Sequence, residues 1–252
     1  MPTQKRSDKY FDGWYANQAV SPLLATVMNR HMGLPPDLLA GVVAAEAIPE
    51  ITAELRLKQG DLLTDLACGR GAYGLLIAAS AGARLLGVDF SGEAVRQARE
   101  QAAQLGNREA EFVVGDLVAT GLPAESADAV LCTDAIQFPD EPIDAYREVR
   151  RVVRPGGRVV LTGWEAIDRE DERLPLKRRQ ADFAGSLAAV GFTEIEVRDR
   201  PAWRERELAM WEEAVALDPG DDPAIRSFHD EGVSVLPTFD LVRRVLATAT
   251  AP

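Results

Sequence analysis

From residue 61 onward, short apolar segments alternate with segments of helical periodicity, and this alternation restricts the fold more than any other feature of the sequence. The apolar segments are rich in Val and Leu, and each is short enough to be a buried strand. They are residues 61–67, 84–90, 110–116, 127–135 and 157–164. Between them, residues 71–81, 91–105 and 140–153 repeat apolar side chains every three or four positions. Because strands joined by crossover helices pair in parallel, we predict a doubly wound α/β sheet with helices on both faces.

The segments on either side of this alternation have different patterns. Residues 1–58 show helical spacing without strand alternation, so we expect an N-terminal helical cap. Residues 59–252 would form the core, with two further strands at 193–200 and 241–251 and a helical insertion at about 200–240. The strand count predicts a mostly parallel, seven-stranded, Rossmann-like sheet. We expect one structural domain overall.

Composition excludes several classes of partner. The formal charge is −12, with 40 acidic and 28 basic side chains, which would repel a nucleic-acid backbone. No apolar run approaches the ~18 residues that cross a bilayer, and the start of the chain lacks the apolar segment of a signal peptide. Neither the two cysteines nor the two histidines show metal-ligand spacing. We therefore expect a cytoplasmic protein with no metal site, nucleic acid or membrane partner, and leave open whether it is a monomer or a homodimer.

A glycine-rich segment, DLACGRGAYG at residues 65–74, joins the first predicted strand to the next helix. In open α/β sheets this turn lies at the edge where ligands bind. Gly69 and Gly71 allow positive φ and close approach of a ligand, and the N–H groups that open the helix favour electronegative atoms. The segment is therefore predicted to bind a ligand. Its glycines alone do not separate a dinucleotide from another nucleoside.

Four carboxylates at predicted strand ends narrow the choice of ligand. They are Asp65, Asp89, Asp116 and Asp134. Asp89 suits the hydroxyls of a ribose, which dinucleotides and adenosyl ligands share. Asp65 would oppose the pyrophosphate of NAD but attract an ammonium group, and Asp116 could accept from an adenine amine. An acidic rim favours a cationic nucleoside. S-adenosyl-L-methionine, with its sulfonium and ammonium groups, has that chemistry.

Five motifs in order make the chain similar to the class I S-adenosylmethionine-dependent methyltransferases. They are DLACGRGAYG, GVDFS, VVGDL, CTDAIQF and RPGGRVVLTGW, and the resemblance covers about residues 60–165. Ala67 departs from the pattern, because many members have Gly there. The chain most resembles actinobacterial-type methyltransferases that act on small molecules such as natural products and sugars. In those proteins N-terminal helices close over the cofactor, and Tyr15 matches an early Tyr that often contacts it.

The resemblance implies a set of cofactor-binding residues. The first motif, including Ala67, Gly69 and Gly71, would hold the methionine end together with Asp65. The remaining residues would be Tyr15 near the cofactor, Asp89 at the ribose, Phe90 and Asp116 at the adenine, Leu117 through its amide, and Thr133, Asp134 and Gln137 beside the sulfonium. Methyl transfer to a small-molecule acceptor would proceed by in-line displacement and leave S-adenosyl-L-homocysteine.

Candidates for a general base are His31, His229 and Glu165, although the histidines equally suit surface helices. Two other functions stay open. An NAD(P)-dependent oxidoreductase could use the GRGAYG loop, but no Tyr is followed four residues later by the Lys of short-chain dehydrogenases. A non-catalytic module that only binds the cofactor is the third hypothesis. The sequence does not name the methyl acceptor.

Overall fold

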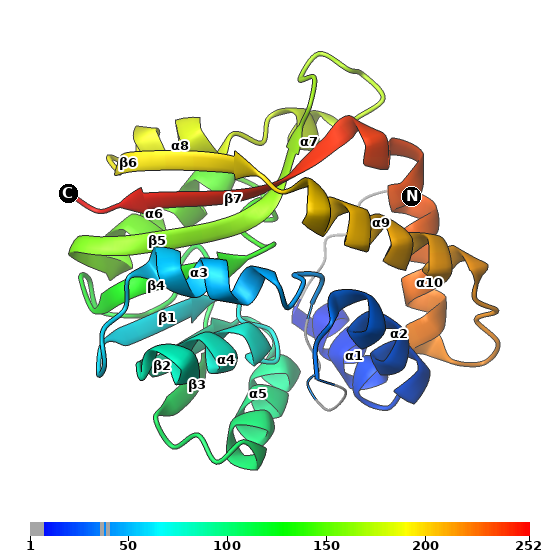
Figure 1. Cartoon of the computed structure of the whole chain (residues 1–252), viewed down its shortest axis with the longest axis horizontal. Coiled ribbons are helices and arrows are strands. Elements are labelled where there is room, and N and C mark those ends of the chain that lie inside the picture. The colour runs from blue at the N-terminus through cyan, green and yellow to red at the C-terminus, as the bar shows by residue number, and fades with distance from the viewer. Residues whose placement is uncertain (1–7, 36–37, 39–40) are drawn as a thin grey trace.

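The centre of the chain is a seven-stranded sheet, as predicted. The computed structural model describes residues 8–35, 38 and 41–252 (Figure 1). The strands are β1 (Leu62–Leu66), β2 (Arg84–Asp89), β3 (Ala110–Val114), β4 (Ala127–Thr133), β5 (Val153–Ala166), β6 (Thr193–Asp199) and β7 (Val242–Thr250), in the order β3-β2-β1-β4-β5-β7-β6. β7 runs antiparallel to both neighbours, and the other neighbouring pairs are parallel. The prediction of a mostly parallel, doubly wound sheet is therefore confirmed.

Helices cover both faces of this sheet. They are α1 (Asp8–Ala19), α2 (Pro22–Met32), α3 (Ala47–Leu55), α4 (Ala72–Ala81), α5 (Gly92–Gln104), α6 (Pro142–Val152), α7 (Leu176–Arg179), α8 (Phe183–Ala189), α9 (Pro201–Ala216) and α10 (Pro223–Val235), with a 3-10 helix, η1 (Leu236–Leu241). α3, α4 and α5 contribute to one apolar core, and α6 and α8 to the core on the opposite face. Strands buried on both sides explain the nearly continuous apolar runs in the sequence. Within the described ranges, no helix has the length and apolarity needed to cross a membrane.

The order of strands reverses at β1. From β1 the chain continues to β2 and β3 on one side, and β4 then returns to the other side of β1. Asp65 in β1 lies in register with Gly87 of β2 and Leu131 of β4. Ligands of open α/β sheets bind beyond the carboxyl ends of the strands at such a reversal. The glycine-rich loop follows β1 and lies at this position.

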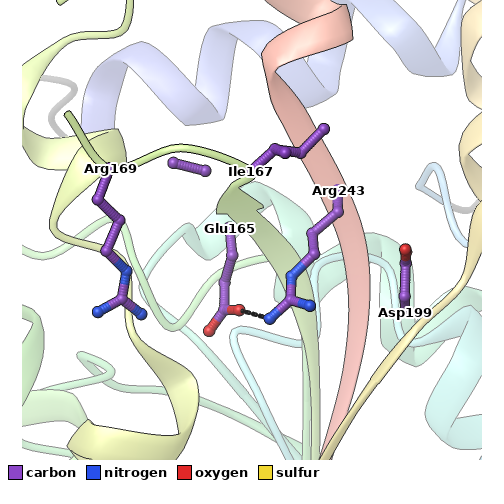
Figure 2. A pocket seen from close by; sticks show the side chains of 6 residues that line it. Glu165, Ile167, Arg169, Asp199 and Arg243 are labelled. Atoms are coloured by element: carbon purple, nitrogen blue, oxygen red, sulfur yellow. Dashed lines mark hydrogen bonds and ion pairs between the residues drawn. The ribbon is translucent and has the colours of Figure 1, made fainter. Parts of the chain in front are cut away.

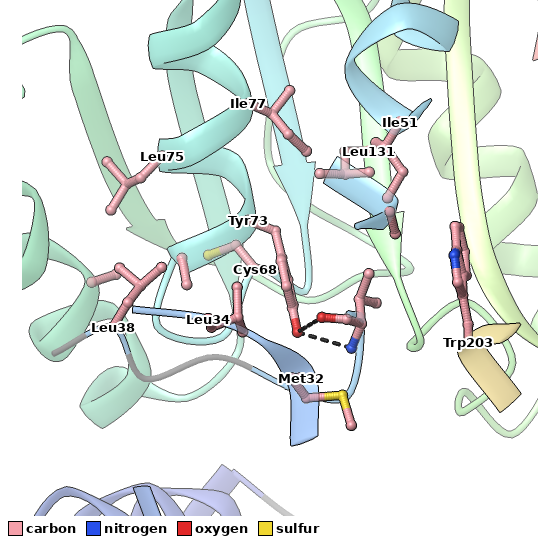
Figure 3. Packing of buried hydrophobic residues seen from close by; sticks show 14 of the residues in the cluster. Met32, Leu34, Leu38, Ile51, Cys68, Tyr73, Leu75, Ile77, Leu131 and Trp203 are labelled. Carbon is pink, nitrogen blue, oxygen red and sulfur yellow. Dashed lines mark hydrogen bonds between the residues drawn. The ribbon is translucent and has the colours of Figure 1, made fainter. Parts of the chain in front are cut away.

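Helices α1, α2, α9 and α10 gather beyond the carboxyl ends of the parallel strands and pack on one another (Figure 1). The first two precede the sheet in sequence, and the other two lie between β6 and β7. The connection after α2 is fixed by Tyr73, whose hydroxyl donates to the Val43 carbonyl at 3.0 Å and accepts from the Val43 amide at 2.9 Å (Figure 3). Residues 1–7, 36–37 and 39–40 of the predicted cap lie outside the described residues. The division into cap, core and insertion stays a prediction.

β5 begins at Val153, earlier than the predicted start at residue 157. The sequence Pro155-Gly156-Gly157 had suggested a turn before the strand. In the structure Val153 pairs with Ala127 of β4, and the Gly156 amide donates to the Ala251 carbonyl at 2.9 Å. Extended pairing therefore starts directly after α6, because both sides of this segment find backbone partners.

Candidate active site

The glycine-rich loop leaves β1 through three residues in the left-handed region of backbone space. Gly69 has φ of 53° and Gly71 has φ of 76°, while Ala67 has φ of 54°. A Cβ on Gly71 would lie 2.6 Å from a ring carbon of Phe112, and one on Gly69 would lie 2.9 Å from the Tyr15 hydroxyl. Both glycines are thus required by conformation and by space. Ala67 adopts a conformation that is costly for a residue with a side chain.

Asp65 lies beneath this loop and is 1% exposed. One of its oxygens, Oδ1, has no hydrogen-bond partner among the described residues. Burial, together with the nearby Asp89, raises the pKa of Asp65 to about 8, although the Gly74 amide favours the ionised form. A buried carboxyl without a charge partner is costly. A cationic group placed beside Oδ1 would remove this cost.

Asp89 ends β2 on the opposite side of the loop and is 3% exposed. Its Oδ2 accepts from the Gly69 amide at 2.8 Å, and its Oδ1 accepts from the Ser91 amide at 2.9 Å. These two bonds fix the carboxylate plane and leave one lone pair on each oxygen. Burial raises the pKa of Asp89, and the two amides oppose that shift. The free lone pairs can accept from a pair of hydroxyl groups, as a ribose presents.

Helix α1 covers the loop and contacts it with polar side chains. The Tyr15 hydroxyl lies against Gly69, and the guanidinium carbon of Arg70 is 5.6 Å from the centroid of the Tyr15 ring. Burial raises the pKa of Tyr15, so its hydroxyl stays protonated. Arg70 Nη2 in turn donates to Gln18 Oε1 at 2.7 Å. Tyr15 is therefore held at the loop, and the contact with a cofactor that the resemblance implies stays a prediction.

α1 is also docked on the start of α5. Asp12 Oδ1 accepts from the Ser91 hydroxyl at 2.6 Å and from the Glu93 amide at 3.1 Å. Phe11 packs edge-on against Phe90, with 5.1 Å between the ring centroids. Phe90 thus lies between α1 and the end of β2, the side of the sheet where the adenine is expected.

The remaining cofactor residues predicted from the sequence lie at the ends of β3 and β4. Asp116 is exposed, and its Oδ1 accepts from the Val118 amide at 2.9 Å, while Leu117 is half-buried. Thr133 ends β4 in register with Thr162 of β5. The Oε1 atom of Gln137 is buried without a hydrogen-bond partner among the described residues. These residues follow the same sheet edge as Asp65 and Asp89, and their roles stay predictions.

Asp134 has a partner that we did not foresee. Its Oδ2 accepts from Arg244 Nη2 at 2.6 Å, and its Oδ1 accepts from the Thr162 hydroxyl at 2.6 Å. The pairing neutralises one of the four acidic charges that we had assigned to the rim. Arg244 is fully buried and also approaches Glu207 of α9, at 3.6 Å from Nη1 to Oε2. Consecutive arginines at 243–244 in an apolar strand were the available signal, because neighbouring strand residues face opposite sides and one must be buried.

The three candidate bases are each engaged elsewhere. His31 Nε2 lies 2.6 Å from Glu213 Oε2, and His229 Nδ1 lies 3.4 Å from Asp230 Oδ1. Glu165 Oε2 accepts from Arg243 at 2.7 Å, and Glu165 Oε1 accepts from the Phe183 amide at 2.8 Å. Figure 2 shows Glu165 and Arg243 in a pocket of about 500 Å³, which is also lined by Ala166, Ile167, Arg169 and Asp199. The structure does not bring the three candidates together.

The fold and the loop define a class of protein. Residues 64–161, from β1 into β5, match a family model described as a methyltransferase domain. This span contains the loop, Asp65, Asp89 and the end of β4. These residues match a methyltransferase domain, and the fold is that of the class I S-adenosylmethionine-dependent methyltransferases.

Individual relatives agree with this class. The chain is 28% identical over 214 residues to 2-methyl-6-phytyl-1,4-hydroquinone methyltransferase of Synechocystis sp., covering 74% of this chain and 64% of that relative. Phosphoethanolamine N-methyltransferase 2 of Haemonchus contortus, solved in complex with S-adenosyl-L-methionine, has a TM-score of 0.75 at 19% identity, covering 96% of this chain and 60% of that chain. The [4+2]-cyclase SpnF has a TM-score of 0.70 at 22% identity, covering 94% of this chain and 95% of that one. The structural likeness shows the fold.

The curated relatives are longer than the region they share with this chain. The shared region spans between 32% and 64% of the length of each of these relatives. The activity and acceptor of this chain must therefore be argued from its own residues.

Proposed function

We propose that the chain transfers the methyl group of S-adenosyl-L-methionine to a small-molecule acceptor and releases S-adenosyl-L-homocysteine. The observation that carries the proposal is Asp65, a buried carboxyl at the glycine-rich loop with a partnerless oxygen. A dinucleotide would place its negative pyrophosphate against Asp65 and Asp89. A ligand with an ammonium group would instead satisfy Asp65, so the residues present fit S-adenosyl-L-methionine better than NAD(P).

The predicted cofactor-binding residues each have a role in this proposal. Asp65 and the amides of the loop bind the methionine end, Asp89 binds the ribose, and Tyr15 covers the loop from α1. Phe90 packs on the adenine, and the Asp116 side chain and Leu117 amide bind its edge. Thr133 and Gln137 border the reacting methyl group. Asp134 is fixed by Arg244 and Thr162. It therefore orients the neighbouring Thr133 and Gln137 rather than binding the cofactor as a free carboxylate.

The bound cofactor supplies an activated methyl group on a positively charged sulfur. The chain's own contribution is alignment and the exclusion of water. α1, α2, α9 and α10 cover the carboxyl ends of the strands and would enclose the acceptor there. None of His31, His229 and Glu165 is required as a base for an acceptor that is already nucleophilic.

The apolar character of this cover supports one class of acceptor. It contains apolar and aromatic side chains such as Trp203, Met210, Trp211 and Phe228. The Synechocystis relative is named for a hydroquinone with a long apolar chain. We therefore propose an acceptor with a substantial apolar part, such as a ring or prenyl chain.

Parallel calorimetric titrations with S-adenosyl-L-methionine and NADPH test the proposed cofactor. We expect micromolar binding of the first and none of the second. Binding of NADPH alone would refute the proposal. Because one protein with this fold is named a cyclase, turnover must be measured separately. Mass-spectrometric detection of a methylated product among hydroquinone, sterol and amine acceptors would establish transfer. Tight cofactor binding without any product would favour the non-catalytic module.

A further inference from the structure

A cluster of buried and half-buried charged side chains lies beside the proposed methyl-transfer site. It consists of Arg244 on β7, Glu207 on α9 and Asp134 after β4, which we call the Arg244 cluster. Arg244 is 0% exposed and Glu207 is 2% exposed. Arg244 lies over the ring of Trp164, with 4.2 Å between its guanidinium carbon and the ring centroid.

Arg244 has donor groups without acceptors. Its Nη2 donates to Asp134, but Nε and Nη1 have no hydrogen-bond partner among the described residues. Nη1 lies 3.6 Å from Glu207 Oε2, which is an ion-pair contact and too long for a good hydrogen bond. Buried donors are nearly always satisfied in native structures, and exceptions mark sites for an absent group. A charged N–H such as Nη1, which faces Glu207, suits an oxygen atom that carries negative charge.

Glu207 is held in one orientation by two tryptophans. Trp164 Nε1 donates to its Oε2 at 3.0 Å, and Trp211 Nε1 donates to its Oε1 at 3.1 Å. Donors on both oxygens suit an ionised carboxylate. Burial raises the pKa of Glu207, and the Asp134 charge adds to that shift, while Arg244 and the two indoles oppose it. The ionised Glu207 is therefore a stronger base than an exposed glutamate.

The Arg244 cluster lies near the glycine-rich loop. Asp134 and Arg244 both act electrostatically on Tyr73, which belongs to that loop and its helix. Asp134 also acts together with Asp65 on Cys132 of β4. The charged and titratable groups facing Glu207 are thus Arg244 from β7 and Asp134 from the end of β4, with Tyr73 of α4 behind them.

We propose that Arg244 binds the acidic hydroxyl of the methyl acceptor as its oxyanion, and that Glu207 takes the proton from that hydroxyl. The acceptor would be a phenol or enol attached to an apolar body. The O–H bond breaks, its electron pair stays on the acceptor oxygen beside Arg244 Nη1, and the proton forms a bond to a Glu207 oxygen. This inference rests on the proposed methyltransferase function, because it describes the acceptor of that reaction.

Binding of a phenol whose phenolate absorbs visible light tests whether Arg244 binds an oxyanion. The chain is first saturated with S-adenosyl-L-homocysteine, and 4-nitrophenol is then titrated at several pH values while the phenolate absorbance is followed. We expect the pKa of the bound probe to fall by about one unit or more, which is about a tenfold preference for the phenolate. 4-Nitroanisole, which has no acidic hydroxyl, should bind at least about tenfold more weakly.

Variants separate binding from folding. Arg244→Gln should abolish the shift of the probe, and Arg244→Lys should keep only part of it, because the ammonium group keeps the charge but not the position of the guanidinium donor. Arg206→Gln, an exposed arginine on α9, is the matched control and should leave the shift unchanged. Unchanged affinity for S-adenosyl-L-homocysteine shows that a variant is folded. A shift that persists in folded Arg244→Gln, or no binding of either probe to the saturated protein, overturns the proposal for Arg244.

Proton counting tests Glu207. Titrating 4-nitrophenol in buffers of different ionisation enthalpy should show little net proton release from the wild-type complex, because Glu207 retains the proton. Glu207→Gln should release about one proton per bound phenolate, while Glu205→Gln, an exposed neighbour, should behave as wild type. Equal release from wild type and Glu207→Gln contradicts the role of Glu207. If S-adenosyl-L-homocysteine does not bind at all, the proposed function fails; if it binds and the phenol results fail, only this inference is lost.

Discussion

At the scale of single residues, the site depends on Asp65 and Asp89, which are both buried but satisfied to different degrees. Asp89 accepts backbone amides on both oxygens, whereas Oδ1 of Asp65 lacks a partner among the described residues. Asp89 is therefore fixed before any ligand arrives. Asp65 is protonated near neutral pH in the free protein, and we propose that a cationic ligand ionises it on binding.

Asp65→Asn should stabilise the ligand-free protein at high pH. The pKa of Asp65 in the folded chain, about 8, lies above its ordinary value of 3.8. Between these pH values the unfolded chain ionises Asp65 while the folded chain keeps it protonated, so the free energy of unfolding falls as the pH rises. Asparagine cannot ionise, so the variant should gain about 2–4 kcal/mol over wild type at pH 8. The gain should vanish near pH 4. Denaturant unfolding at both pH values measures it, and an equal difference at pH 4 and pH 8 would show that ionisation is not the cause.

Asp89→Ala should weaken binding of S-adenosyl-L-methionine by about 10–100-fold, because about 1.5–3 kcal/mol of charge-assisted hydrogen bonding is lost. Calorimetric titration measures the loss. Asp116→Ala is a useful comparison, since Asp116 is exposed and a hydrogen bond there is worth less. Undiminished affinity in Asp89→Ala would remove Asp89 from the ribose site.

Ala67→Gly should stabilise the chain slightly. Ala67 has φ of 54°, a conformation that costs an alanine about 1 kcal/mol more than a glycine. The greater freedom of glycine in the unfolded chain offsets part of this gain, leaving about 0.5 kcal/mol. Denaturant unfolding provides the measurement. A loss of more than about 1 kcal/mol, as expected for glycine in a helix, would show that the positive φ is wrong.

At the scale of elements, α1 connects the cover to the loop and to α5. Asp12 accepts from the Ser91 hydroxyl and the Glu93 amide, at the N-terminus of α5 where a carboxylate is favoured. Phe11 and Tyr15, one and three positions away along the same helix, contact Phe90 and Gly69. Docking of α1 should therefore respond to the loss of the Asp12 carboxylate.

Asp12→Asn should loosen α1 without unfolding the core. Loss of the charge at the start of α5, which also weakens both hydrogen bonds to Oδ1, should cost about 1–2 kcal/mol of local stability. Hydrogen exchange of the α1 amides should accelerate about 5–30-fold, while exchange in β1 and β4 stays as in wild type. Asp8→Asn, at the exposed start of α1, serves as the control. Unchanged exchange in α1 would mean that Asp12 does not hold the helix.

Most helices and strands of the core could be predicted from the sequence, whereas contacts between distant elements could not. The strands and the helices of the core followed from apolar runs and three- to four-residue spacing, because burial on both faces of a parallel sheet imposes those patterns. The glycine-rich loop and Asp89 followed from local geometry. The Asp134–Arg244 pair did not, since it joins β4 to β7 across a separation in sequence of 110 residues. The start of β5 was also missed, because its backbone partners, Ala127 of β4 and Ala251 just after β7, are distant in sequence.

At the scale of the whole molecule, two segments distant in sequence assemble one cover over the sheet edge (Figure 1). α1 and α2 come from the N-terminal part, and α9 and α10 come from the segment between β6 and β7. The cover packs as a unit against one end of the strands, so cofactor and acceptor would be enclosed between it and the sheet.

The most direct test of a buried carboxyl that binds a cationic nucleoside is the number of protons released when S-adenosyl-L-methionine binds. At pH 6.5 Asp65 is protonated in the free protein, since its pKa is about 8. Contact with the ammonium group should ionise it. Titrations in buffers of different ionisation enthalpy should therefore show release of about one proton, which Asp65→Asn should abolish. Binding without proton release, or equal release from Asp65→Asn, would contradict the account.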